Sequence, residues 1–444
     1  MALGGGHFTA QNKVLPGTYI NFVSVASASA ILSGRGIATV PLELDWGVDG
    51  EVFAVSNTDF FENSQKIFGY SYDHEKMKGL RDLFRGAQTL YAYRLNGNGK
   101  KASNAYAVAL CTGVRGNDLK IVIQTNTDDE SMFDVLTYLD TNRVDSQTVA
   151  TAADLVANEY VTFKTDASLA VTAATPLTGG ENGTVDGSAY QDYADKIESY
   201  TYNTMGIAST DDTIKKMFIA FNKRLRDELG IKFQLVLYNY PADYMGVINV
   251  QNKCTDGATV SGITTTYPDE AALVYWVTGA ECACEVNKTC QNKEYDGEYA
   301  VDTAFTQTEL IQAIQNGRFT LHKVNDSIRV LEDINSMVTV SDTCGDVFKE
   351  NQTIRVIDQL ANDDAVLFNT KYLGVVPNGE SERTALWSDL VKIRKELEKL
   401  RAIEDFSEDD VTVSQGETKK SVVVDNSITV VNAMSKLYMT TTVA

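Results

Sequence analysis

The sequence has few of the residues on which most enzymes depend for proton transfer. Only three histidines, His7, His74 and His322, occur in 444 residues. None of them lies in a metalloprotease spacing, and no serine sits in a G-x-S-x-G elbow. General acid–base chemistry near neutral pH therefore has few candidate groups. We expect no catalytic residues, and a hydrolase that uses an α/β domain is the less favoured alternative.

Cysteines are also few and widely spaced. A disulfide framework of the secreted type needs a denser pattern, so reduced thiols are the expectation for Cys111, Cys254, Cys282, Cys284, Cys290 and Cys344. The alternative is a zinc site made by four of them, Cys254, Cys282, Cys284 and Cys290. Structural zinc sites usually contain C-x2-C pairs, whereas Cys282 and Cys284 are separated by one residue. We expect neither a metal nor another cofactor.

Long apolar runs and excess positive charge are missing as well. No window approaches 18 consecutive apolar residues, and the start MALGGGHFTAQNK has no basic segment before an apolar one. The sequence therefore predicts no membrane span and no signal peptide, and we expect a protein made and kept in the cytoplasm. The net charge of −21 argues against direct nucleic-acid binding, which needs clustered positive potential.

What is present is enough apolar material, 43% of the residues, for a core and for two to four domains. Residues 1–18 contain a glycine run and a Leu-Pro-Gly turn, which predict a flexible arm. Residues 19–95 predict an N-terminal α/β domain, with strand-like TYINFVSV and GIATVPLEL before a helical stretch from Thr58 to Gly86.

The middle of the chain changes character twice. Residues 96–177 are rich in Val, Thr, Ala and Asn in short alternating runs, which predicts a β-sandwich insert. After the linker TGGENGT, helical and strand-like segments alternate through residues 178–330. That alternation predicts an α/β domain with a parallel sheet and crossover helices.

The C-terminal region, residues 331–420, contains the most regular helical pattern of the chain. Its apolar positions step by four and three and form one seam, made by Leu386, Leu390, Ile393, Leu397 and Leu400. Basic residues fall mostly elsewhere on the same helix. The pattern predicts a basic helix surface on an acidic protein.

The last segment, residues 421–444, reads SVVVDNSITVVNAMSKLYMTTTVA and is typical of β-strands. Ordering its last ten residues costs on the order of 10–20 kcal/mol. Burial of Leu437, Met439 and Val443 returns about 5–9 kcal/mol, and each ladder hydrogen bond adds about 1 kcal/mol. Because the sum is near zero, the strand needs a complete receiving sheet, either in its own domain or in a neighbouring subunit. Composition alone favours its own domain.

An ordered set of motifs over nearly the whole chain resembles the contractile tail sheath proteins of Firmicutes phages and phage-like bacteriocins. The motifs are LPGTYINFVS, RGIATVPLEL, the linker at Leu177 to Gly183, and a C-terminal series. That series comprises Ile354 to Asp358, Tyr372-Leu373-Gly374, Asn378, the helix at 386–403, FSEDDVTV and the strand-like ending.

The resemblance implies a multidomain α+β and α/β fold. Its parts are a non-catalytic subtilisin-like middle domain, an outer β-sandwich insert and a C-terminal inner domain that exchanges strands through both terminal arms. The exchanged positions carried over are Ile20, Phe22, Val422, Val424, Ile428, Val430, Leu437 and Met439. Attachment to the tail tube is carried over to Lys392, Arg394, Lys395 and Lys399.

The resemblance also implies a function and partners. The protein is expected to form sixfold rings that stack into a helical polymer around a tail tube protein, between baseplate and tail-terminator proteins. Contraction of a metastable extended state would drive the tube through a cell envelope. The expected location is the tail of a virion or phage-like particle, assembled in the cytoplasm of a host bacterium. A self-assembling cell-surface protein of the S-layer type is the main alternative.

Overall fold

A computed structural model describes residues 32–257, 259–261 and 264–443. The arm predicted over residues 1–18, and the predicted exchange positions Ile20 and Phe22, lie outside the described residues. The described chain divides into two compact units. We call residues 34–358 with 432–443 the core unit, and residues 32–33 with 359–431 the C-terminal unit.

The core unit is organised around a six-stranded sheet. Its strands are β1 (Ile37–Leu42), β2 (Val52–Ser56), β3 (Thr89–Arg94), β10 (Thr204–Ile207), β11 (Gln234–Tyr238) and β12 (Val247–Val250). They lie in the order β12-β11-β10-β1-β3-β2, and all neighbours are parallel except β2 and β3. The parallel sheet that the sequence predicts is confirmed. The sheet joins segments 37–94 and 204–250, however, which the sequence analysis places in two separate domains.

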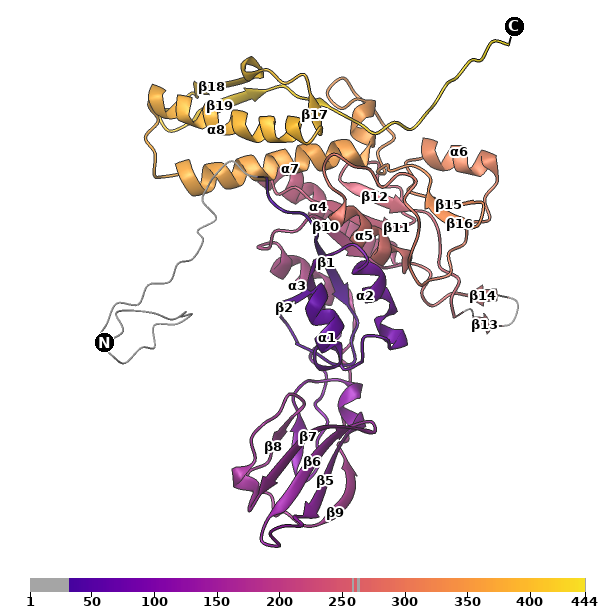
Figure 1. Cartoon of the computed structure of the whole chain (residues 1–444), viewed down its shortest axis with the longest axis vertical. Helices are drawn as coiled ribbons and strands as arrows, with labels where there is room; N and C mark the ends of the chain where they lie inside the picture. Colours follow the sequence, from indigo (N-terminus) through magenta and orange to yellow (C-terminus); the bar gives the residue numbers. More distant parts are fainter. Residues whose placement is uncertain (1–31, 258, 262–263, 444) are drawn as a thin grey trace. The chain divides into compact units, whose positions relative to one another are not determined.

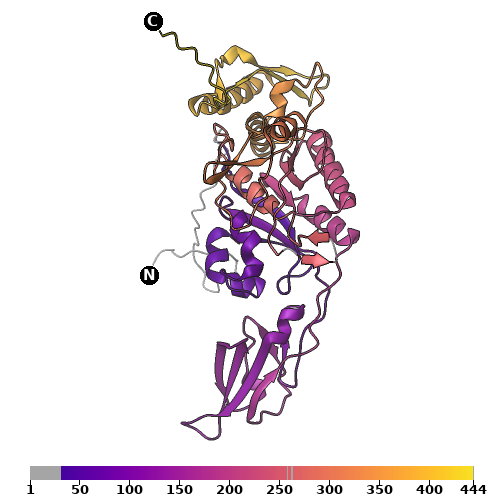
Figure 2. The same cartoon turned by 90° about the vertical axis from the view of Figure 1, so that its right-hand side faces the viewer.

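Alternating side chains of this sheet enter different cores, as the period of two in a strand requires. Leu235 and Leu237 pack with residues of α3 (Gly187–Ile197) and α4 (Asp212–Lys223), while Val236 packs with residues of α5 (Leu273–Ala283). Helices therefore cover both faces of the sheet (Figures 1 and 2). This is a three-layer α/β arrangement. The likeness of this layer to subtilisin stays a prediction.

The helical stretch predicted from Thr58 to Gly86 is three elements. They are α1 (Asn57–Phe68), the 3-10 turn η1 (Glu75–Met77) and α2 (Lys78–Leu83). Ser56 begins α1 with a capping box to Asp59, and Gly69 ends it with a left-handed φ of 80°. A single-helix interpretation was wrong because Gly69 acts as a C-cap.

The β-rich insert consists of two sheets. One has four strands, β7 (Asn142–Val149), β6 (Phe133–Leu139), β5 (Leu119–Thr125) and β9 (Thr172–Pro176), and the other pairs β4 (Ala107–Ala109) with β8 (Val161–Phe163). Turns η2 (Val114–Asp118) and η3 (Ala152–Asp154) connect them. Their inner residues, among them Ile121, Val135 and Phe163, share one core. The two segments that enter and leave the insert are joined by isolated β-bridges. One bridge links Lys100 to Glu181 and the other links Ser103 to Thr178.

The rest of the core unit is built of short elements. A π-helical turn η4 (Arg224–Leu229) extends α4, and two hairpins pair β13 (Thr259–Ser261) with β14 (Thr264–Thr266) and β15 (Leu321–Val324) with β16 (Ser327–Val330). Helix α6 (Gln307–Gln315) starts at a capping box between Thr306 and Glu309. No helix in the described ranges has the length and apolar content that crossing a membrane requires.

The C-terminal unit combines helices with two small sheets. After η5 (Asp346–Lys349) in the core unit, helix α7 (Asn351–Leu367) crosses the boundary between the units along the chain. The elements that follow are the π-helical turn η6 (Phe368–Tyr372), α8 (Glu380–Lys399), β17 (Ile403–Glu404), η7 (Glu408–Asp410), β18 (Val411–Gln415), β19 (Val422–Asn426) and β20 (Thr429–Val430).

Candidate functional site

Helix α8 presents its apolar seam to the interior of the C-terminal unit. Leu386, Leu390, Ile393 and Leu397 are buried, as the spacing predicts, whereas Leu400 follows the helix and is 42% exposed. The helix packs on β18, and the indole nitrogen of Trp387 donates a 2.9 Å hydrogen bond to the Val411 carbonyl. The predicted seam is confirmed at four positions and wrong at Leu400.

Arg394 is not a surface residue of this helix. Its side chain is 2% exposed, and both terminal nitrogens donate to Asp364, each at 2.6 Å. The Nε of Arg394 also donates to Asn426 at 3.1 Å. The expectation that Arg394 contacts a tail tube is corrected, because the guanidinium holds α7, α8 and the end of β19 together inside the unit.

The other three predicted tube-contact residues are exposed, and each has an acidic partner in its own chain. Lys392 pairs with Asp389 at 3.0 Å, Lys399 with Glu396 at 3.3 Å, and Lys395 with Glu408. Pairing of this kind compensates part of the positive charge. The surface of α8 is thus less basic than its lysine content suggests.

Asp389 receives more than one of these cations. Burial would raise the pKa of its carboxyl, but hydrogen bonds from Lys371, Tyr372 and Lys392 outweigh burial and hold the pKa below its ordinary value. The carboxylate therefore fixes Lys392 to the helix surface.

The first part of the strand-like ending pairs within its own unit. Val422 and Val424 lie in β19, opposite Gln415 and Val413 of β18, and Val430 of β20 lies opposite Ile403. Ile428 lies between β19 and β20, and the exchange of Val422, Val424, Ile428 and Val430 between subunits stays a prediction. A connection of only six residues joins β18 to β19, so local pairing costs little loop entropy.

Both small sheets keep open edges. The pairs β18–β19 and β17–β20 are two-stranded, and no third strand joins either pair among the described residues. Val423 and Val424 are exposed on β19. Unpaired backbone groups at such an edge can accept a strand from another chain.

The final residues carry apolar side chains without cover. Residues 432–443 contain no helix or strand (Figure 1). The side chains of Met434, Leu437, Tyr438, Met439 and Val443 are at least 78% exposed. The sequence analysis names Leu437 and Met439, and it missed Tyr438 although the residue lies between them in the same strand-like run.

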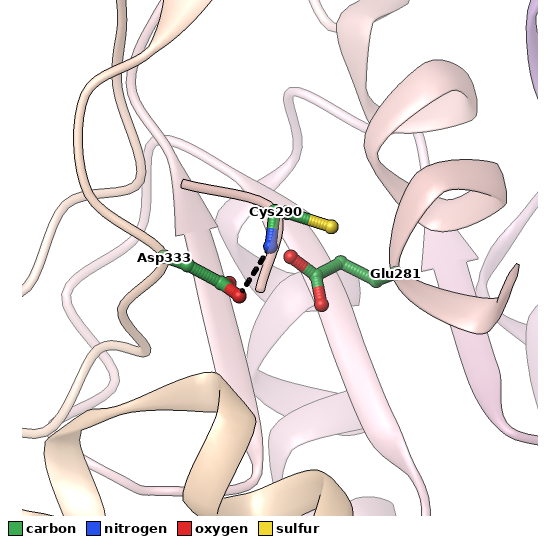
Figure 3. A group of neighbouring side chains, drawn as sticks. All are labelled: Glu281, Cys290 and Asp333. Atoms are coloured by element: carbon green, nitrogen blue, oxygen red, sulfur yellow. Dashed lines mark hydrogen bonds between the residues drawn. The ribbon is translucent and has the colours of Figure 1, made fainter. Parts of the chain in front are cut away.

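A buried ionic cluster joins three parts of the core unit. Arg355 of α7 donates to Asp333 at 2.6 Å and pairs with Glu281 of α5. Asp333 also accepts from the backbone N–H of Cys290 at 2.8 Å, and the thiol of Cys290 lies toward Glu281 (Figure 3). The cluster links the end of α5, the loop at 290 and the start of α7.

The two carboxyl groups of this cluster differ in their affinity for a proton. Burial would raise the pKa of Asp333, but the Arg355 charge and several hydrogen bonds lower it to about 2. Burial and the neighbouring Asp333 raise the pKa of Glu281 well above its ordinary value. Asp333 is therefore ionised at neutral pH, and Glu281 holds its proton more strongly than an exposed glutamic acid does.

The same cluster contains the one set of potential metal donors in the described residues, Glu281, Cys290 and Asp333. Arg355 already contacts both carboxylates and supplies the positive charge that a cation would bring. Of the four thiols considered as zinc ligands, only Cys290 belongs to this set. The donor set does not fit a metal.

A cavity of about 380 Å³ opens beside the ends of β1 and β10, where Leu42 and Ile207 line it. Crevices at the carboxyl ends of parallel strands commonly hold ligands. Its described lining includes Ser209, Tyr190 and Glu43 but neither histidine nor cysteine. The described lining thus lacks a conventional base for a serine nucleophile.

Family models match almost the whole described chain. The tail sheath protein Gp18 domain III N-terminal region matches residues 35–95, and the phage tail sheath beta-sandwich domain matches 96–182. The phage tail sheath central domain matches residues 183–336, and the phage tail sheath C-terminal domain matches 344–444.

Individual relatives extend over the full length. The phage-like element PBSX protein XkdK of Bacillus subtilis is 31% identical over 98% of both chains. The crystal structure of a sheath tail protein from Desulfitobacterium hafniense has a TM-score of 0.80 and 34% identity, covering 95% of this chain and 99% of that one. A sheath tail protein from Listeria innocua has a TM-score of 0.76 and 30% identity, covering 92% and 94%. The chain therefore belongs to the phage tail sheath protein family.

Proposed function

We propose that this protein is the sheath subunit of a contractile tail. It polymerises as stacked rings around a tail tube in a metastable extended state, then contracts to drive the tube through a cell envelope. The observation that carries this proposal is the full-length similarity to the Desulfitobacterium hafniense sheath tail protein, with 34% identity and a TM-score of 0.80. The fold alone is shared with the contracted helical sheath of the anti-feeding prophage, at a TM-score of 0.55 and 13% identity.

Assembly uses the last residues of one copy and a sheet edge of another. Residues 432–443 expose large apolar side chains and form no strand in their own chain, while β18–β19 and β17–β20 keep open edges. An extended segment added to such an edge gains backbone hydrogen bonds and buries alternate side chains. Leu437 and Met439 are the inserted side chains, and Ile20 and Phe22 serve a reciprocal N-terminal link.

In this arrangement, the free-energy cost of ordering residues 432–443 arises when the subunits assemble. Burial of a large apolar side chain contributes about 1.5–3 kcal/mol, whereas ordering one backbone residue costs about 1–2 kcal/mol. The tail alone cannot meet that cost, since its five large apolar side chains have no cover in the described chain. A receiving sheet buries these side chains and provides partners for the backbone hydrogen bonds of the added strand.

Tube attachment uses the exposed lysines of α8, which are Lys392, Lys395 and Lys399. Their intrachain partners Asp389, Glu408 and Glu396 hold them in place, and an acidic tube surface can compete for the same cations. The further partners are baseplate and tail-terminator proteins, and assembly takes place in the cytoplasm of the bacterial host.

The test is electron microscopy of the purified protein with and without its tube protein. Wild-type protein is expected to form striated hollow cylinders, and a Leu437→Asp/Met439→Asp variant to remain unassembled. The matched control is Val375→Asp, which changes an equally exposed apolar residue, 75% accessible, in the C-terminal unit. Cylinders formed equally well by the Leu437→Asp/Met439→Asp variant would exclude the tail as the exchanged segment. No cylinders from the wild type under any tested condition would count against the sheath function itself.

A further inference from the structure

Two cysteines lie close together at the ends of a short loop in the core unit. Cys284 follows the last residue of α5, and Cys290 closes the segment CEVNKTC six residues later. Cys284 is half-buried, while Cys290 is 1% exposed. The Cys290 thiol donates a hydrogen bond of 3.7 Å to the Ala280 carbonyl, which also accepts from the Cys284 N–H at 3.1 Å. Both cysteines pack in the same apolar cluster and are therefore neighbours in the folded chain.

The surroundings favour a thiolate on Cys284. The Cys290 thiol and the nearby Arg355 lower the pKa of Cys284 to about 7 although burial opposes them. Arg35 donates from Nε to the Cys284 carbonyl at 2.8 Å and from Nη2 to the Glu281 carbonyl at 3.2 Å. This cation occupies the C-terminal end of α5, where the helix dipole alone would disfavour a negative sulfur.

The remaining described cysteines lack this combination of partner and accessibility. Cys254 and Cys282 are buried, and burial raises the pKa of each thiol to about 12. Burial likewise raises the pKa of Cys111. Cys344 has the Met337 sulfur, 3.7 Å away, as its sulfur neighbour. Cys284 and Cys290 thus differ from the other four cysteines, none of which combines a neighbouring cysteine with a lowered pKa.

We propose that Cys284 and Cys290 form a reversible disulfide when the protein meets a low-molecular-weight disulfide. The Cys284 thiolate attacks one sulfur of that disulfide and releases one small thiolate. Cys290 then gives up its proton and attacks the Cys284 sulfur of the mixed disulfide, which releases the second small thiol. The two cysteines are oxidised by two electrons, and the small disulfide is reduced to two thiols.

Closure of this bond would fasten the end of α5 to the loop that feeds the ionic cluster. Thr289 and the N–H of Cys290 both donate to Asp333, and the Lys288 carbonyl accepts from Arg355 at 3.1 Å. The bond would stay open in a reducing cytoplasm and close after release from the cell. The chemistry does not depend on the proposed sheath function.

Peptide mapping of the native full-length chain tests the proposal. Trypsin cleaves after Lys253, Lys288 and Lys293, so Cys290 lies on residues 289–293 and Cys284 on residues 254–288. After treatment with oxidised glutathione, alkylation and digestion, the two peptides are expected to remain joined and to separate on reduction. Fragmentation of the joined species should place the link at Cys284.

Matched variants distinguish this pair from the neighbouring thiols. Cys284→Ser should abolish the joined species, while Cys282→Ala, two residues away, should retain it. In Cys290→Ala, Cys284 should instead accumulate as a stable glutathione adduct. Separate peptides from oxidised native wild type, or joined peptides that persist in Cys284→Ser, would overturn the proposal.

Discussion

At the scale of single residues, Arg355 places a positive charge in the interior of the core unit. Its guanidinium is fully buried and contacts both Asp333 and Glu281. A buried ion pair adds little net stability compared with apolar residues, but removal of one partner leaves an uncompensated charge. The cluster therefore makes the junction of α5 and α7 sensitive to single substitutions.

Arg355→Met should lower the free energy of unfolding of the core unit by about 3–5 kcal/mol, because Asp333 would remain buried without its cation. Urea unfolding followed by tryptophan fluorescence measures this change. Arg329→Met is the control, since Arg329 pairs with the exposed Glu294 and should cost less than about 1 kcal/mol. Equal effects of the two substitutions would contradict the assigned role of Arg355.

Glu281→Gln should change how stability depends on pH. The pKa of Glu281 is higher in the folded than in the unfolded chain, so its contribution is complete below about pH 4 and is lost as the pH rises. The neutral amide that replaces the carboxyl group does not ionise, so the variant should not lose this stability as the pH rises. Relative to wild type, the variant should gain stability between pH 5 and pH 8 in thermal melts. Glu294→Gln, at an exposed pair, should show no such trend.

At the scale of elements, the basic residues of α8 lie on two different faces of the helix. One face points into the C-terminal unit and the other is exposed. Arg394 anchors the helix to Asp364 and Asn426, whereas Lys392 and Lys395 pair at its surface. Charge at positions only one or two residues apart thus has different consequences. Helix geometry causes the difference, because neighbouring positions point 100° apart.

Arg394→Met should lower the free energy of unfolding by about 2 kcal/mol, because Asp364 and Asn426 lose a charged donor. Lys392→Glu/Lys395→Glu should leave the melting temperature nearly unchanged and reduce sheath-on-tube yield in co-sedimentation. An unchanged yield would remove these lysines from the tube contact. A large fall in melting temperature of the lysine variant would instead show that they are structural.

Local patterns in the sequence predicted local structure well. The buried seam from Leu386 to Leu397 follows from spacing alone. Arg394 was predicted as a surface residue because its partner Asp364 is thirty positions away and carries no spacing signal. For the same reason, sequence spacing did not predict the cluster of Glu281, Asp333 and Arg355. These residues are far apart in the sequence and come together only in the folded chain.

At the scale of the whole molecule, the two parts of the C-terminal segment differ in their strand pairing. Residues 422–430 complete sheets of their own chain, whereas residues 432–443 have no strand partner among the described residues. A cut at either end of this segment should therefore have different effects. The boundary between the paired and the unpaired part lies next to Val431.

Deletion of residues 432–444 should leave a folded protein that fails to polymerise. Deletion of residues 421–444 should also destabilise the C-terminal unit, since β19 and β20 would be lost. Size-exclusion chromatography and thermal melting measure the two properties separately. Identical melting curves for both deletions would mean that β19 and β20 contribute nothing to the fold of the subunit.

The paired entrance and exit of the β-sandwich insert carry a consequence for engineering and for evolution. The Lys100 N–H donates to Glu181 at 2.9 Å and the Glu181 N–H returns a bond to Lys100 at 3.1 Å, so the two crossing points of the chain are adjacent. A cassette with adjacent ends can be excised and closed with a short turn, or exchanged for another module, without stretching the strands it interrupts. The insert can accordingly diversify while the six-stranded sheet of the core unit is retained.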